Sequence, residues 1–290
     1  MKSLIYTVAL CLLIVVAAKA QTKTSCCVKP AADAAETTEA TIKFAMLGND
    51  ESFREKHENP LPFTLENKKG KTITYKTPDG KTATAYEIKA PKKTDEYLFV
   101  FHEWWGLNDY IRKEAERFAQ ELGNVNVIAL DLYDGKVATE REKAAEYMQA
   151  VKTDRAKAII NGAIAYAGKD ADIATVGWCF GGAWSLQAGI LAGDKAEAIV
   201  MYYGMPEQNV ENLKKLDAPV LGIFASQDNS ITPQVVEEFK QNMDKADRKL
   251  TVKMYDAVHA FANPSNPKYN KEYAEEAHKL AVDFIKKHLD

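Results

Sequence analysis

Gly177, Cys179 and Gly181 form a Gly-x-Cys-x-Gly sequence between a short apolar run and a stretch of helix-forming residues. In the serine version of this pattern, the nucleophile occupies a sharp strand-to-helix turn, and glycines flank it because side chains would collide with the strained backbone. The sequence therefore predicts a nucleophile elbow whose reacting atom is the sulfur of Cys179. Its position at the start of a helix favours the thiolate form. Without the two glycines, a cysteine in an apolar run would more simply be a buried structural residue.

Asp228 and His259 follow two later apolar runs and could complete a catalytic site with Cys179. An aspartate at this place could accept the Nδ1 proton of a histidine, although a loop aspartate is also a common turn former. His259 is one of five histidines in the chain, and it lies between the last predicted strand and the last predicted helix. The chain order of nucleophile, acid and histidine is that of the α/β-hydrolases. A thiol beside an imidazole forms a thiolate near neutral pH and attacks an ester carbonyl, and water then releases the acyl group with the histidine as base.

The elements that must position these residues alternate between buried strands and amphipathic helices from residue 97 onward, which predicts an α/β fold. Single helices between strands imply right-handed crossovers and a mostly parallel sheet flanked by helices on both faces, with reactive loops at the carboxyl ends of the strands. Alternating residues at 71–76 and 82–88 surround a Pro-Asp-Gly turn, so a β-hairpin should precede this sheet. We expect strands at 97–101, 126–130, 173–176, 196–203, 220–225 and 250–255, and helices at 109–122, 140–167 in two pieces, 183–192, 233–243 and 273–288.

The first 20 residues have the pattern of a secretory signal peptide. Lys2 supplies a positive start, residues 4–18 are almost wholly apolar, and an Ala-Lys-Ala sequence ending at Ala20 is a cleavage site of the A-x-A type. An uncleaved membrane anchor is the alternative, but the apolar run is short for a membrane span. We therefore expect an exported protein, periplasmic or secreted, without stable membrane insertion once the leader is removed.

Residues 21–67 form an N-terminal extension that we expect to be partly flexible, with a possible short helix and an extended approach to the domain in its second half. Cys26 and Cys27 lie in its polar first part. We interpret them as exposed thiols or an intermolecular disulfide rather than as a metal site, since no histidine or cysteine of suitable spacing follows. The catalytic domain is predicted to span residues 68–290.

The composition excludes several classes of protein. With 290 residues, of which 46% are hydrophobic and 27% charged, the chain is typical of an ordinary soluble globular protein. A net charge of -3 with interleaved signs gives no basic face for nucleic acid. The expected partner is a small-molecule or acyl substrate. No metal ion or other cofactor is expected, and a monomer is favoured.

A second group of motifs carries a resemblance to a known family. The loop after the 97–101 strand contains Glu103, Trp104 and a glycine, and it is followed by Asp-Leu-Tyr at 131–133, the elbow, a Gln-Asp turn and a His-x-Phe-Ala sequence. Over roughly residues 70–290 the chain resembles the dienelactone hydrolase family. That resemblance implies that Glu103 contacts and guards the thiol until substrate displaces it. It also implies that the Trp104 N–H binds the oxyanion, beside the N–H of Phe180, which directly follows the nucleophile.

The specificity residues match the family less well than the catalytic ones. The resemblance implies two arginines that bind a substrate carboxylate, and Arg141 stands at the matching place for one of them, unless it is a solvated helix charge. Asn263 occupies the place of the other, and Ala260 stands where family members carry a hydroxyl, so the identity of the ester is left open. Six aromatic residues could line an apolar pocket above the thiol or belong to the core: Trp104, Trp105, Tyr133, Phe180, Tyr203 and Phe261.

These observations predict a hydrolase that cleaves a small lactone or carboxylic ester, similar to a carboxymethylenebutenolidase, through Cys179, His259, Asp228 and an acyl-cysteine intermediate. The alternative is a non-catalytic protein that binds a small molecule on the same fold. Such a protein would have no need to keep all three residues. A thiol redox protein ranks last, because no Cys-x-x-Cys sequence accompanies Cys179.

Overall fold

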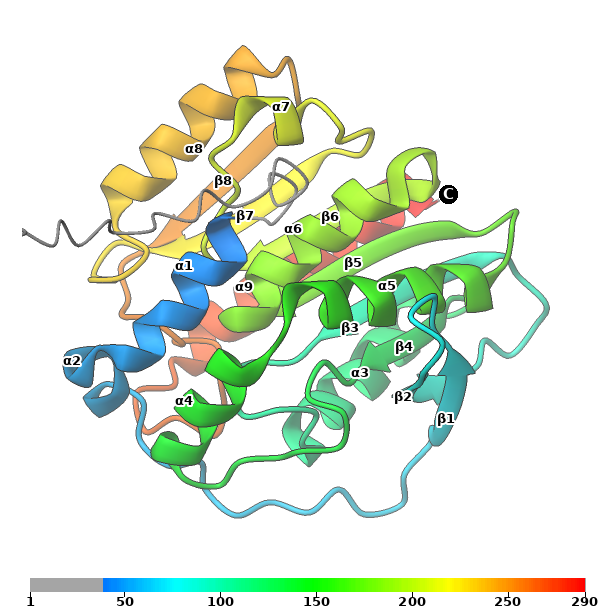
Figure 1. The fold of residues 1–290 in the computed structure, drawn as a ribbon, viewed down its shortest axis with the longest axis horizontal. Coiled ribbons are helices and arrows are strands. Elements are labelled where there is room, and N and C mark those ends of the chain that lie inside the picture. Colours follow the sequence, from blue (N-terminus) through cyan, green and yellow to red (C-terminus); the bar gives the residue numbers. More distant parts are fainter. Residues whose placement is uncertain (1–38, 290) are drawn as a thin grey trace, which may run out of the picture. The chain divides into compact units, whose positions relative to one another are not determined.

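A computed structural model describes residues 39–289 of the chain. Within this part, the strands form an eight-stranded sheet in the order β1-β2-β4-β3-β5-β6-β7-β8 (Figure 1). The first two strands, β1 (Lys71–Lys76) and β2 (Thr82–Ile88), are the predicted antiparallel hairpin. Strand β2 also pairs antiparallel with β4, and every later pair is parallel. The predicted α/β architecture with a mostly parallel sheet is confirmed.

The central strands explain why the reactive loops meet. Strands β3, β5, β6 and β7 are buried along almost their whole length because both of their faces are covered. In their register, Gly177 of β5 lies beside Phe101 of β3 and Met201 of β6, so these strands end at one edge of the sheet. The strands that follow the hairpin are β3 (Glu96–Phe101), β4 (Asn126–Leu130), β5 (Asp172–Trp178), β6 (Ala196–Tyr202), β7 (Val220–Ala225) and β8 (Leu250–Tyr255).

Helices cover both faces of the sheet, as predicted. Figure 1 shows α3 (Asp109–Leu122) and α9 (Lys271–Leu289) behind the sheet, where they pack on β4 and β6 and on each other. The opposite face carries α6 (Phe180–Ala192), which packs on β5 and β6. The remaining elements are α4 (Arg141–Ala150), α5 (Thr153–Ala167), η3 (Gly193–Lys195), α7 (Val210–Leu213) and α8 (Pro233–Lys245).

The described part of the N-terminal extension is helical. It contains α1 (Glu39–Met46), the 3-10 turn η2 (Leu47–Asn49) and α2 (Glu51–Glu55), and α1 packs against α6 and α4. Phe44 and Phe53 anchor these helices, since both side chains are buried. The possible short helix of this region is therefore present as two helices, which cover the loops at the carboxyl edge of the sheet. The predicted leader, its cleavage site, and Cys26 and Cys27 lie outside the described residues.

Two boundaries at the sheet edge differ from the predicted ones. Helix α6 begins at Phe180 rather than at residue 183, because close packing of Gly181 against the backbone of Phe101 overrides the weak helix propensity of glycine. Strand β6 ends at Tyr202, since Tyr203 adopts a φ of 36°, which no strand residue can have. The predicted two pieces of the 140–167 helix are confirmed as α4 and α5.

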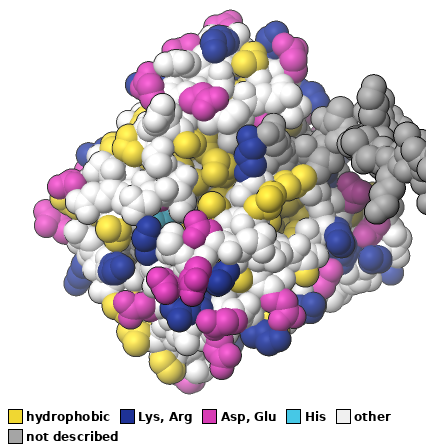
Figure 2. Space-filling view, turned by 60° about the vertical axis from the view of Figure 1, so that its left-hand side comes forward, with side chains coloured by type: hydrophobic (Ala, Val, Ile, Leu, Met, Phe, Trp, Pro, Cys, Tyr) yellow, Lys and Arg dark blue, Asp and Glu magenta, His cyan; other side chains and the backbone are white. Residues whose placement is uncertain are grey.

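The surface agrees with the composition. On the face drawn in Figure 2, side chains of Lys and Arg are interspersed with those of Asp and Glu, and almost no histidine is visible. Among the helices of residues 39–289, none combines the length and the apolar character that a membrane crossing would need.

Candidate active site

The turn between β5 and α6 holds Cys179 in a strained conformation. Its φ of 57° and ψ of -119° are rare for a residue with a side chain. A Cβ atom on Gly177 would lie 2.1 Å from the carbonyl oxygen of Gly181, and one on Gly181 would lie 2.4 Å from that of Phe101. Both flanking positions therefore require glycine. The backbone N–H of Cys179 donates to the Tyr202 carbonyl at 3.0 Å, which fixes the turn against β6. The predicted elbow geometry is present.

Three loops bring Cys179, Asp228 and His259 into a hydrogen-bonded row. The Nε2 atom of His259 lies 3.4 Å from the sulfur of Cys179, and its Nδ1 atom lies 2.5 Å from Oδ2 of Asp228. The other carboxylate oxygen of Asp228 accepts the backbone N–H groups of Ser230 and Ile231 at 2.8 and 3.0 Å. Because a carboxylate accepts, Nδ1 of His259 carries a proton, and Nε2 faces the sulfur. The three residues predicted from chain order are thus in contact.

Burial and charge act in opposite directions on these groups. Burial would raise the pKa of Asp228, but the His259 charge and the two backbone N–H groups lower it overall. Burial would lower the pKa of His259, but Asp228 and Cys179 raise it well above its ordinary value. Burial raises the pKa of the Cys179 thiol, and His259 offsets this only in part. A thiolate near neutral pH therefore stays a prediction, because burial and His259 act on the pKa of Cys179 in opposite directions.

The predicted oxyanion donors lie on two different loops. The N–H of Phe180 forms a hydrogen bond with the sulfur of Cys179, which lowers the pKa of the thiol slightly against burial. The Trp104 carbonyl accepts the hydroxyl of Tyr133 at 3.1 Å, which holds the second loop in place. His102 also ties this loop down, since its Nδ1 donates to the Glu103 carbonyl at 2.6 Å. The role of the Trp104 N–H stays a prediction.

Glu103 is buried and bound by two polar side chains. One carboxyl oxygen accepts the hydroxyl of Tyr203 at 3.3 Å, and the other accepts the side-chain amide of Asn263. Burial raises the pKa of Glu103 to about 7, although His259, Tyr203 and Asn263 act against this. Among the described residues, no hydrogen bond joins Glu103 to Cys179, so the guarding contact stays a prediction. Asn263, which stands where the resemblance implies an arginine, serves here as the partner of Glu103.

The predicted pocket aromatics are all buried. Tyr133 packs against Phe180 with ring centroids 5.5 Å apart, and it lies close enough to Cys179 for the thiolate charge to raise its pKa further above the level set by burial. Trp105 packs edge-on against Trp104. Phe261 is fully buried and packs on the aromatic core behind the site. Their roles in substrate binding stay predictions.

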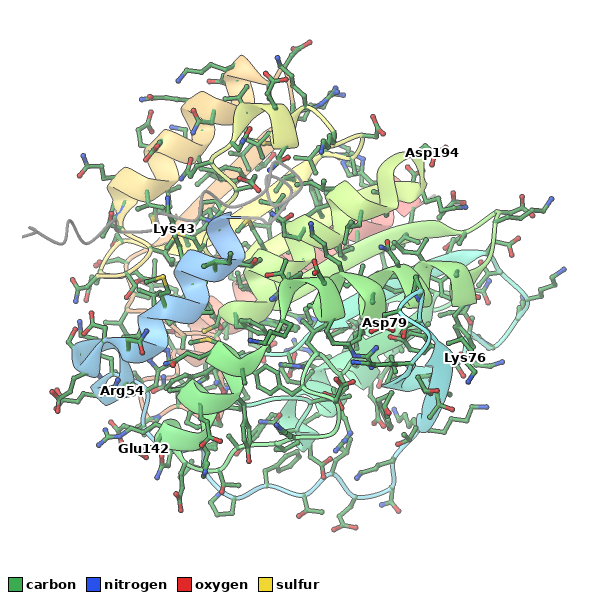
Figure 3. All side chains as sticks on the ribbon, viewed as in Figure 1. Lys43, Arg54, Lys76, Asp79, Glu142 and Asp194 are labelled. Atoms are coloured by element: carbon green, nitrogen blue, oxygen red, sulfur yellow. The ribbon has the colours of Figure 1, made fainter. Side chains whose placement is uncertain are left out.

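Two other predicted positions are Arg141 and Ala260. Arg141 begins α4, where its side chain is 39% exposed and pairs with Glu142 at 3.0 Å. Figure 3 labels Glu142 at the outer end of this helix, and within residues 39–289 the hydrogen bonds of Arg141 go to Glu142 and Asn59 and not to the thiol. Ala260 has a φ of 60°, and its carbonyl accepts the N–H of Asn263 at 3.0 Å, which closes the turn after the histidine. The role of Arg141 in substrate binding stays a prediction.

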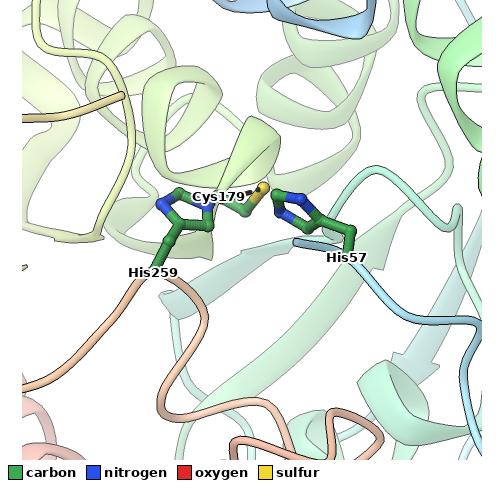
Figure 4. Close-up of side chains that lie close together, drawn as sticks. All are labelled: His57, Cys179 and His259. Carbon is green, nitrogen blue, oxygen red and sulfur yellow. Dashed lines mark hydrogen bonds between the residues drawn. The ribbon is translucent and has the colours of Figure 1, made fainter. Parts of the chain in front are cut away.

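His57 is a site residue that the sequence analysis missed. It follows α2 and is buried, with its ring centroid 5.2 Å from that of His259 and 4.6 Å from that of Trp104. Its Nδ1 donates to the Phe53 carbonyl at 2.7 Å. Burial lowers the pKa of His57 to about 3, and the charge of His259 lowers it too, so the ring is neutral. Figure 4 shows this ring on the side of the Cys179 sulfur opposite His259. No strand precedes His57, so a search of strand ends could not find it.

The N-terminal helices close the site. Cys179 is only 1% exposed, and Phe44 and Phe53 lie with ring centroids 6.5 and 6.0 Å from that of His259. A cavity of about 260 Å³ between α1, α4 and α6 reaches Phe180. A second cavity, of about 100 Å³, lies beside the histidines, and its lining includes Phe53, Lys56, His57, Asp228, His259 and Lys268.

Comparison with known proteins identifies the family to which the sequence is similar. The sequence profile of the dienelactone hydrolase family matches residues 83–289. Protein usf of Aquifex pyrophilus is 29% identical over 215 residues, which cover 70% of this chain and 92% of that protein. The carboxymethylenebutenolidase of a Pseudomonas strain is 24% identical over 204 residues, covering 66% of this chain and 84% of the relative.

Solved structures share the architecture at lower identity. A dienelactone hydrolase-like promiscuous phosphotriesterase from metagenomic libraries aligns with a TM-score of 0.66 and 18% identity, covering 76% of this chain and 98% of that one. A Pyrococcus furiosus esterase aligns with a TM-score of 0.59 and 14% identity, covering 80% of this chain and 100% of that one. These matches show that the fold is the predicted α/β-hydrolase fold.

Proposed function

The chain belongs to the dienelactone hydrolase family and is a hydrolase, and we propose that it cleaves a small lactone or carboxylic ester through an acyl-Cys179 intermediate. One observation carries this proposal: the hydrogen-bonded row of Asp228, His259 and Cys179 at the carboxyl edge of the sheet. A nucleophile, a base and a group that orients the base are the minimum set for acyl transfer. A protein that only binds small molecules would not need this row.

In the first half of the reaction, the thiol proton of Cys179 passes to Nε2 of His259 while the sulfur attacks the carbonyl carbon. Asp228 stabilises the imidazolium that forms. The negative charge that develops on the carbonyl oxygen is stabilised by the N–H of Phe180, with that of Trp104 as the proposed second donor. His259 then gives its proton to the leaving alkoxide, and the acyl group stays on the sulfur.

In the second half, water enters between His259 and the acyl carbon. Nε2 takes a proton from the water, and the resulting hydroxide attacks the thioester. The sulfur of Cys179 leaves and recovers the proton from His259, so a carboxylic acid is released and the resting thiol is restored. Because the resting site is closed, substrate must enter past α2 or displace it. The small neighbouring cavities favour a small acyl group.

The test is to incubate the full chain with a panel of lactones and activated aryl esters, and to measure turnover together with the mass of the protein. The expected result is an acyl adduct on Cys179 and loss of turnover in Cys179→Ala. Turnover should survive replacement of both Cys26 and Cys27 by alanine. An active Cys179→Ala variant would exclude the mechanism. Ligand binding without any adduct or turnover would favour the non-catalytic alternative.

A further inference from the structure

Three ligating atoms converge around the sulfur of Cys179. One ring nitrogen of His57, one of His259 and the Sγ atom of Cys179 all lie within 4.8 Å of one another. Figure 4 shows the sulfur between the two rings. Of the three residues, His57 is the one for which the proposed ester hydrolysis has no role. Its convergence on the other two therefore calls for a separate explanation.

The hydrogen-bond partner of each ring shows which nitrogen is left to bind a metal ion. Nδ1 of His57 donates to the Phe53 carbonyl at 2.7 Å, and Nδ1 of His259 donates to Asp228 at 2.5 Å. Histidines that bind metals have this arrangement, in which a carbonyl or carboxylate holds one ring nitrogen and the other keeps its lone pair. Nε2 of His57 has no hydrogen-bond partner within residues 39–289, although its side chain is only 5% exposed. A buried acceptor without a partner is unfavourable, and a bound cation would satisfy it.

We propose that His57, Cys179 and His259 form a binding site for a thiophilic divalent cation of the Zn²⁺ type, which keeps the hydrolase inactive while it is bound. One thiolate and two imidazoles suit Zn²⁺, and three protein ligands leave its fourth position open to water. Ca²⁺ and Mg²⁺ prefer oxygen ligands and do not fit this set. On binding, the S–H bond breaks, the proton goes to solvent, and a sulfur–metal bond forms. The thiolate and the Asp228 carboxylate together balance the two positive charges.

The distances allow such a site after a small movement. Zn–N bonds of about 2.0–2.1 Å and Zn–S bonds of about 2.3 Å place tetrahedral ligand atoms about 3.3–3.6 Å apart. The 3.4 Å between Cys179 and His259 already meets this requirement. His57 must approach by no more than about 1.5 Å to reach this separation, and it follows the short peripheral helix α2. The cavity of about 100 Å³ beside the two histidines offers a path for the ion.

The closing experiment uses the metal-free full chain with Cys11, Cys26 and Cys27 replaced by alanine, so that Cys179 is its remaining thiol. Zn²⁺ is titrated by calorimetry, and Co²⁺ is added as a spectroscopic probe. His57→Gln removes one ligand. His288→Gln, near the end of α9, removes a histidine away from the site and is the matched control. Aryl-ester hydrolysis is followed in parallel.

We expect one Zn²⁺ per chain, a thiolate-to-cobalt charge-transfer band, and inhibition of hydrolysis over the same Zn²⁺ range as binding. Loss of an outer-shell partner alone lowers metal affinity about 10–100-fold. His57→Gln should therefore weaken Zn²⁺ binding by at least about 100-fold, while His288→Gln leaves it unchanged. Equal affinity in His57→Gln and in the parent would overturn the proposal, as would the absence of a Co–thiolate band.

A second variant keeps the test decisive if His57→Gln does not fold. Cys179→Ser changes one atom and should weaken Zn²⁺ binding by at least about 100-fold in calorimetry, and a Zn²⁺ affinity equal to that of the parent would contradict the site. The inhibition readout rests on the proposed hydrolase function, whereas the binding and spectroscopic readouts do not. A failed esterase assay with an intact cobalt spectrum would therefore count against the ester substrate and not against the metal site.

Discussion

At Cys179, the burial that shields the sulfur also opposes its ionisation. Burial raises the pKa of the thiol and His259 lowers it, while Asp228 and Cys179 raise the pKa of His259 well above its ordinary value. Asp228 acts on His259: its negative charge raises the pKa of the imidazole and so favours the imidazolium. The proton between Cys179 and His259 can therefore lie on either group, and Asp228 favours its place on the imidazole.

Asp228→Asn should remove the stabilisation of the His259 imidazolium while leaving the fold intact. An amide cannot stabilise the imidazolium, and its N–H₂ group would force the proton of His259 onto Nε2. We expect ester hydrolysis to fall by about 10²–10⁴-fold, measured as kcat/KM. Asp194→Asn, at the labelled position of η3 in Figure 3, is the control and should keep full activity. An Asp228→Asn variant that stays within a fewfold of the parent would contradict the assigned role.

Glu103 should make stability depend on pH. Its pKa is about 7 in the folded protein against an ordinary value of 4.5, so the folded state holds the proton more tightly. The stabilisation from this proton is complete below pH 4.5 and is lost as the pH rises through about 7. Glu103→Gln removes the titration, so its free energy of unfolding should rise relative to the parent across this window, by up to about 3 kcal/mol.

Urea denaturation of the parent and of Glu103→Gln at pH 4.5, 6 and 8 measures this difference directly. Titrating groups that do not interact with Glu103 affect both proteins equally and cancel in the comparison. Glu211→Gln, at a side chain that is 77% exposed on α7, is the control and should show a constant difference from the parent. A constant difference for Glu103→Gln as well would mean that burial does not control this carboxyl group.

At the scale of elements, α1 and α2 separate the reactive sulfur from solvent. Phe53 is the main contact, since its ring packs on His57 at 4.2 Å and on Trp104 at 5.5 Å between centroids. The glycine-flanked elbow places the sulfur at the edge of the sheet, and the two N-terminal helices then cover it. Access to the nucleophile therefore depends on a segment that precedes the hairpin and the matched family region.

Phe53→Ala should weaken the packing of α2 over the sulfur of Cys179. Truncating a buried phenylalanine costs about 3–5 kcal/mol of stability, and the loss should fall mainly on α2. We expect lower stability and faster alkylation of Cys179 by iodoacetamide, followed by mass spectrometry of the peptide that carries it. Met46→Ala, at a side chain that is 60% exposed on α1, should change neither quantity. An unchanged alkylation rate in a destabilised Phe53→Ala protein would show that α2 does not control access.

At the scale of the whole molecule, the chain combines a region that matches the family with an N-terminal segment that precedes this region. The interspersed charges on the face in Figure 2 and the net charge of -3 favour a small-molecule substrate over a nucleic acid. Export of the protein is a proposal, based on the apolar stretch and the small-residue site that ends at Ala20. A monomer also stays a prediction.

Expression in a secreting host tests the proposed export. The mature chain should begin at Gln21, because signal peptidase cuts after small residues at the end of the apolar run. N-terminal sequencing and intact mass of the exported fraction measure this. A mutation of Ala20 to a bulky residue such as phenylalanine is expected to block processing. Recovery of the protein with Met1 still attached, bound to membranes, would favour the uncleaved anchor.

Much of the site could be predicted because its residues are tied to strand ends. Cys179, Asp228 and His259 each directly follow an apolar run, and parallel strands end at one edge of a sheet, so chain order alone predicted their meeting. The glycines at 177 and 181 were informative because the elbow has no room for a Cβ. The local sequence pattern and the order of the strands are therefore sufficient to predict the elbow and the meeting of the three residues.

His57, the partners of Glu103 and the raised pKa of the thiol could not be predicted in this way. Each depends on which surfaces pack together: α2 on the loops around Cys179, Asn263 on Glu103, and the aromatic side chains that exclude water. The sequence by itself determined the fold class, the family and the row of reacting groups, because periodicity and spacing are local properties of a chain. Only the tertiary structure decided that the sulfur is closed off and faced by a second imidazole, because burial is the sum of contacts between segments far apart in sequence.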